Sequence, residues 1–243
     1  MAMLTQKLSN SIPSTHYGYA GGSASCQESF DGIIKGASFE QLPHAEKHDE
    51  IDVRLAGSKI NSEQFLELVG FIEKKAAAIT VLDLSNCGLT TDMLRFILTA
   101  FTKQPDECSL CFLLLNSNSL KDEDAFLIAD FLPVIARRKL QHPNFMLNLD
   151  DNLLTCQGAI RLIERSSETG TRGISMQNNE LNKNADSSAL LRFFMDSPLE
   201  ILRIGGNDFP DQTIWTMQPQ FSQRKQLYVD LITTGDCPMY IKA

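Results

Sequence analysis

An eleven-residue pattern recurs along the chain and constrains its fold more than any other feature. Residues 79–89, 110–120 and 199–209 carry an apolar residue, mostly leucine, at positions 1, 4, 6 and 11, and asparagine or cysteine at position 9. Residues 147–154 and 174–181 match positions 4 to 11. A pattern that returns in phase indicates one structural unit built several times over.

Weaker copies lie at both ends of this series. Residues 53–60 have Ser58 at position 9, and residues 229–236 have Thr234 there and lack the last apolar residue. Terminal units are expected to be atypical because they cover the ends of a stack. Successive copies are 27 to 34 residues apart, which leaves room for a strand and a helix in each unit.

The pattern resembles the leucine-rich-repeat family, and the repeat length is similar to that of its ribonuclease-inhibitor-like subclass. The resemblance covers roughly residues 50–240. It implies an α/β fold, a right-handed solenoid with parallel strands on the concave face and helices on the convex face. We therefore expect about seven repeats over residues 50–243. Residues 1–49, which are rich in Gly and Ser near 16–25, are expected to form a flexible N-terminal segment that could also cap the first repeat.

Local patterns explain why each unit should fold this way. Leu82 and Leu84 alternate with Asp83, so the leucines should point to the core and the aspartate to the other face of a strand. Asn61 and Gln64 have the spacing of a capping box, before apolar residues at helical intervals. We expect seven parallel strands centred near the position-6 residues, each followed by a helix.

The residues at position 9 are expected to form a ladder. A small polar side chain at this turn can pair backbone groups of adjoining units that would otherwise be buried without a partner. Its seven members are Ser58, Cys87, Asn118, Asn152, Asn179, Asn207 and Thr234.

Composition and charge disfavour several classes of function. The formal net charge is -8 and the isoelectric point about 5.0, whereas nucleic-acid binders usually present a basic face. No apolar run is long enough for a membrane span, and we find no apolar signal-peptide region. Six scattered cysteines without an export signal indicate reduced thiols and a cytoplasmic protein.

Two groups of residues are candidates for chemistry. Cys108 and Cys111 form a CxxC, but no second CxxC accompanies them, so we interpret them as structural. Asp150 and Asp151 are adjacent acids, which we interpret as part of a polar binding surface and not as an acid–base pair. We therefore expect no enzyme activity, no metal and no cofactor.

The expected function is that of a protein–protein interaction module or adaptor, because the repeats account for nearly the whole chain. The resemblance implies that a protein partner lies on the concave strand face, and we expect the chain to be a monomer. The partner-binding residues predicted there are Arg54, Asp83, Asn116, Asn148, Asp150, Gln177 and Arg203.

Two alternatives stay open at this point. The compact array is also similar to small bacterial leucine-rich-repeat effectors that are secreted and act in a host cell. It would equally suit a regulatory or substrate-recognition subunit of an enzyme complex. The residues do not separate these possibilities.

The isolated CxxC yields a first prediction. Folding should not depend on zinc, because two thiolates are too few for a structural site. A chelator should leave the thermal unfolding curve of the purified protein unchanged. Stoichiometric zinc that is lost together with the fold on chelation would contradict this interpretation.

Overall fold

A computed structural model describes residues 51–103, 108–136, 145–183, 185–197, 199–210, 212, 228–230 and 240–241. The expected N-terminal segment, the helix expected after Phe209 and the ladder position Thr234 lie outside these residues. The described strands are β1 (Ile51–Arg54), β2 (Ile79–Asp83), β3 (Phe112–Leu114), β4 (Phe145–Asn148), β5 (Thr171–Ser175), β6 (Ile201–Arg203), β7 (Tyr228–Asp230) and β8 (Tyr240–Ile241). The described helices are α1 (Ser62–Lys75), α2 (Thr91–Thr102), α3 (Asp122–Ala136), α4 (Cys156–Ser166) and α5 (Ser187–Met195).

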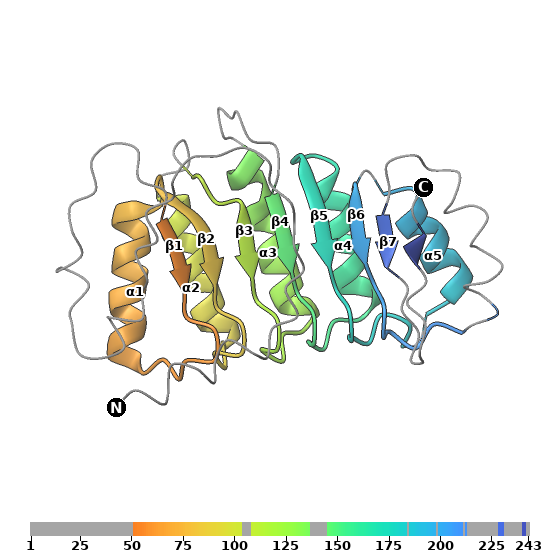
Figure 1. Cartoon of the computed structure of the whole chain (residues 1–243), viewed down its shortest axis with the longest axis horizontal. Coiled ribbons are helices and arrows are strands. Elements are labelled where there is room, and N and C mark those ends of the chain that lie inside the picture. Colours follow the sequence, from red (N-terminus) through yellow and green to blue (C-terminus); the bar gives the residue numbers. More distant parts are fainter. Residues whose placement is uncertain are drawn as a thin grey trace.

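The strands form one sheet in sequence order (Figure 1). Strands β1 to β7 are parallel, which confirms the prediction of an α/β fold with a parallel sheet. The prediction of seven parallel strands is confirmed, and β8 adds an antiparallel strand beside β7 that was not predicted. Only residues 231–239 connect these two strands, and a parallel pairing needs a crossover of about a dozen residues or more.

The strands also end earlier than expected. Each stops one residue before position 6, as β2 does at Asp83 before Leu84. Hydrogen bonding nevertheless continues past the strand end, since Leu84 N donates to Leu114 O (2.9 Å) and Asn86 N to Asn116 O (2.8 Å). The motif therefore marks the turn that follows each strand more closely than the strand's centre.

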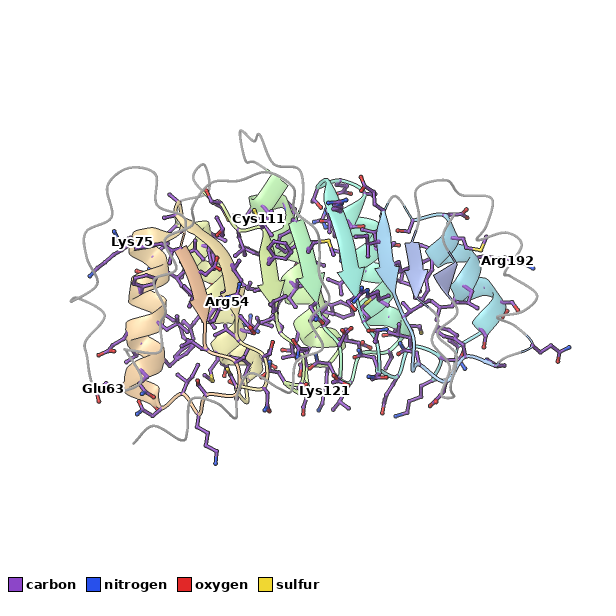
Figure 2. All side chains as sticks on the ribbon, in the orientation of Figure 1. Arg54, Glu63, Lys75, Cys111, Lys121 and Arg192 are labelled. Carbon is purple, nitrogen blue, oxygen red and sulfur yellow. The ribbon has the colours of Figure 1, made fainter. Side chains whose placement is uncertain are left out.

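The five described helices return the chain to the end of the sheet at which the parallel strands begin. Figure 2 shows this for α1, with Glu63 near the lower edge, where the strands end, and Lys75 near the upper edge. The predicted capping box is confirmed: Gln64 N donates to Asn61 Oδ1 (2.9 Å), and Asn61 N donates to Gln64 Oε1 (3.1 Å). Thr90, Thr155 and Asp186 cap α2, α4 and α5 by accepting backbone N–H groups with their side-chain oxygens.

The apolar core lies between the sheet and the helices. Helices α2, α3 and α4 lie behind the sheet in Figure 1, so they cover one of its faces. One inward residue from each of five strands builds the sheet side of this core, and each is at most 1% exposed: Leu82, Leu113, Leu147, Ile174 and Leu202. None of the described helices covers the opposite face, which we call the helix-free face.

The predicted asparagine ladder joins the turns that follow the strands. The side-chain oxygen of Asn152 accepts from Asn118 N (3.0 Å) and Leu120 N (2.9 Å) of the preceding unit. Its amide nitrogen donates to Leu115 O (3.2 Å) in that unit and to Leu149 O (3.0 Å) in its own. One buried side chain thus satisfies backbone groups of two neighbouring units.

The same arrangement recurs along the array. The four ladder asparagines are buried, with exposures from 2% to 7%, and each bonds backbone atoms of the unit before it: Asn118, Asn152, Asn179 and Asn207. At Cys87 the thiol donates to Leu55 O (3.0 Å) in place of an amide. Burial raises the pKa of this thiol to about 11, so it keeps its proton at neutral pH.

A left-handed backbone residue precedes every described ladder position. The φ values lie between 52° and 73° at Gly57, Asn86, Ser117, Asp151, Asn178 and Gly206. Gly, Asn and Asp tolerate this region best, which explains their frequency here. At Gly206 a side chain is also excluded by space, because a Cβ atom would lie 1.9 Å from Asn178 Oδ1.

The ladder generates a stability prediction. Replacement Asn152→Ala or Asn179→Ala leaves buried backbone N–H groups without acceptors, which costs about 1–3 kcal/mol each. Urea unfolding should show this loss. The control Gln157→Ala removes an exposed polar side chain from α4 and should change stability little. If the unfolding curves of both ladder variants match the wild-type curve, the ladder does not contribute to stability as predicted.

Candidate functional site

Three rows of side chains cross the helix-free face. They belong to residues that alternate with the core residues along each strand and its following turn. The first row comprises Asp52, Val81, Phe112, Met146, Gly173 and Ile201. The second row comprises Arg54, Asp83, Leu114, Asn148, Ser175 and Arg203. The third row, just past the strand ends, comprises Ala56, Ser85, Asn116, Asp150, Gln177 and Gly205.

Asp150 is the most connected acid of this face. Its Oδ1 atom accepts from Ser175 Oγ (2.6 Å) and Gln177 N (2.7 Å), and its own N–H donates to Asn148 Oδ1 (2.8 Å). Burial raises the pKa of Asp150, although these hydrogen bonds and the charge of Arg203 act in the opposite direction. The fold thus holds a carboxylate where its charge is poorly solvated.

A second polar cluster surrounds Asp83. Its Oδ1 atom accepts from the N–H (3.1 Å) and the hydroxyl (2.6 Å) of Ser85. The Ser85 hydroxyl also lies against Asn116 Oδ1 on the next turn. These bonds fix the direction of the carboxylate while leaving Asp83 only partly buried.

The remaining predicted residues lie toward the ends of the second row. Arg54, at the end of β1 (Figure 2), is exposed and forms an ion pair with Asp52 (3.0 Å). Arg203 is partly buried on β6, beside Asp230 of β7 in the register of the sheet. All seven predicted residues therefore lie on one face. Local contacts join most of them into two clusters, around Asp83 and around Asp150, whereas Arg54 pairs with Asp52.

The first row, which is largely apolar, was not predicted from the sequence. Phe112, Met146 and Ile201 are partly exposed and lie outside the core cluster, and Val81, although only 9% exposed, is also outside it. The same two-residue alternation that identified Asp83 predicts that Val81, two residues earlier, lies on the same face of the sheet.

Gly173 keeps this row continuous. A Cβ atom at this position would lie 2.7 Å from both Sδ and Cε of Met146 and 2.8 Å from Cβ of Ile201. The side chain of Met146 therefore occupies the space that a side chain on β5 would need. Met146 on β4 and Ile201 on β6 therefore both border the position of Gly173 on β5.

The cysteine candidates lie elsewhere. Cys111 is at the start of β3, at the opposite edge of the sheet from Lys121 (Figure 2), and Cys108 is buried. Neither forms a disulfide. Within the described ranges, no three His, Cys, Asp or Glu residues are grouped closely enough to hold a metal ion.

Comparison with known proteins gives a fold likeness. No family model matches the sequence, and no curated protein sequence matches it. Among solved structures, the chain is similar to Leiomodin-1 Actin-Binding Site 2, at 16% sequence identity with a TM-score of 0.50. The match covers 65% of this chain and 88% of that one. At this identity the likeness concerns the fold alone.

Among the helices in the described part of the chain, none is both long and apolar enough to cross a bilayer.

The raised pKa of Asp150 generates a prediction about pH. The folded chain holds this proton more tightly than the unfolded chain, whose aspartate pKa is about 3.9. The resulting stabilisation is complete below that pH and is lost as the pH rises through the folded value. Asp150→Asn keeps an acceptor for Ser175 and Gln177 without the charge. It should therefore be more stable than wild type at pH 7, and the difference should shrink toward pH 4.

Urea unfolding between pH 4 and pH 7 tests this prediction. Asp208→Asn, which removes an exposed carboxylate, is the control and should track wild type across the range. An Asp150→Asn variant whose stability difference from wild type does not change with pH would contradict the assignment.

Proposed function

We propose that this chain is a protein-binding module of the leucine-rich-repeat type, and that its helix-free face holds the partner. In this proposal the sheet is the concave face of a right-handed solenoid and the helices form its convex face. One observation carries the proposal: this face combines polar and apolar side chains that no described helix covers. They include the poorly solvated carboxylate of Asp150 and the partly exposed apolar residues of the first row.

The energetics of these residues support a role in binding. A carboxylate whose burial opposes its ionisation lowers stability at neutral pH, and such costs are typical of functional sites. Partly exposed apolar side chains in a row are likewise typical of surfaces that bind other proteins. Both features lie on the same face of the sheet, where the three rows offer shape, apolar area and directed hydrogen bonds together.

The repeated geometry supports the family assignment. Each of the six units from β1 to β6 contributes a strand, a turn with a left-handed residue and a ladder position, followed in five of them by a described helix. The similar solved structure is named for an actin-binding site, which is a statement about that protein. It is in keeping with protein binding by this type of fold.

The proposal extends to the setting in which the module works. We propose a monomeric, cytoplasmic adaptor without catalytic activity or cofactor, with no nucleic acid as partner because of the acidic charge. Translocation into a host cell as a bacterial effector is the variant of this proposal that a secretion assay would decide.

Neutralising the acids of the face tests the proposal. The double variant Asp83→Asn/Asp150→Asn keeps the hydrogen-bond acceptors and removes both charges. The control, Glu123→Gln/Glu164→Gln, removes two exposed charges from α3 and α4. The immobilised proteins are used to capture partners from cell lysate for identification by mass spectrometry.

A partner captured by wild type and by the control should be lost from the Asp83→Asn/Asp150→Asn variant. The same variant should melt no lower than wild type at pH 7, which separates binding from folding. A partner retained by this variant and lost from the helix-face control would show that the helix-free face is not the binding surface.

A further inference from the structure

Three neighbouring strands of the helix-free face, β2, β3 and β4, differ in chemistry from the strands beside them. Strands β2, β3 and β4 and their turns contribute nine positions to the three rows. Four are apolar, two are aspartates and three are neutral polar, and none is basic: Val81, Asp83, Ser85, Phe112, Leu114, Asn116, Met146, Asn148 and Asp150. This part of the face is therefore both apolar and acidic.

The apolar residues and the acidic residues of this surface lie at different positions along the strands. Val81, Phe112 and Met146 are direct neighbours in the sheet register, and Leu114 extends the apolar area one step toward the strand ends. The acids lie on the strand-end side of the apolar first row. An apolar band is thus bordered by carboxylates along one edge.

The charges of these acids are not neutralised by ion pairs within the described ranges. The basic side chain of Arg54 on β1 is paired with Asp52, and none of the ion pairs there involves Asp83 or Asp150. Ser85 and Ser175 hold the two carboxylates in fixed directions through hydroxyl groups. A partner that brought basic groups would supply charge-assisted hydrogen bonds to preoriented acceptors.

The length of the whole first row, of which this band is a part, suits a short polypeptide segment. From β2 to β6 the first row crosses four strand spacings, or about 19 Å at roughly 4.8 Å each. A helix of about 12 residues, with a rise of about 1.5 Å per residue, spans nearly this length. Such a segment would lie across the strands, with its apolar side chains on the band and its polar side chains toward the acids.

From this juxtaposition we propose that the helix-free face binds a polypeptide segment of about 12 residues that presents apolar side chains beside lysine or arginine. The apolar side chains pack on Phe112, Leu114 and Met146, and the basic groups bind Asp83 and Asp150. This inference rests on the proposed function and specifies the chemistry of the partner.

A library of random twelve-residue peptides displayed on phage tests the proposal with the full chain as bait. Enriched sequences should combine apolar residues with lysine or arginine. The best peptide is then synthesised with a fluorescent label, and its affinity is measured by anisotropy at low and high salt.

Matched variants locate the binding surface. Met146→Gln on the face is compared with Leu66→Gln, which alters an exposed apolar residue of α1. Asp83→Asn is compared with Glu123→Gln on α3. The two face variants should weaken binding about tenfold or more, and Asp83→Asn should also reduce its salt dependence; the two helix variants should stay within about twofold of wild type.

Four other outcomes would contradict this inference, and each identifies the part of it that is wrong. Enriched peptides that lose affinity with Met146→Gln but carry acidic or no charged residues would refute the basic partner while leaving face binding intact. Loss of affinity only with Leu66→Gln would refute both. A library without any saturable binder would exclude a short segment, and a wild-type dimer in sedimentation that Met146→Gln dissociates would assign the face to a second copy of this chain.

Discussion

The structure depends first on the asparagine ladder. A turn that buries its backbone between two units cannot rely on water for hydrogen bonds, and each ladder side chain supplies the missing partners on both sides. Asn152 does this for the units that contain β3 and β4. Because the bonds join neighbouring turns, they set the spacing of the strands and hence the register of every row on the helix-free face.

The proposed binding surface follows from that register. Alternation along a strand sends one set of residues into the core and leaves the other set facing away from the helices. Stacking then aligns equivalent residues, so that Phe112 and Met146 become neighbours although 34 positions separate them in the sequence. A largely apolar row and the two acids beside it, Asp83 and Asp150, are brought together in this way from single residues in separate repeats.

The sequence predicted the parallel sheet, the helices, the ladder and the outward position of Asp83 and Asp150, because all of these follow from a periodic pattern. It did not predict β8, which lies beyond the last complete pattern and depends on the short connection after β7. The burial of Asp150 could not be predicted from the sequence, because it depends on Ser175 and Gln177 of the following unit. The two-residue alternation along the strands also predicts the apolar first row, but we applied it only to positions beside and beyond the paired leucines.

The central claim is that a partner lies against the helix-free face. The most direct measurement places a photo-crosslinking phenylalanine analogue either at Phe112 on that face or at Phe96, which is 59% exposed on α2. After irradiation with the captured partner, the account predicts a crosslinked product from position 112 and none from position 96. A crosslink from position 96 alone would contradict it and move the binding surface to the helices.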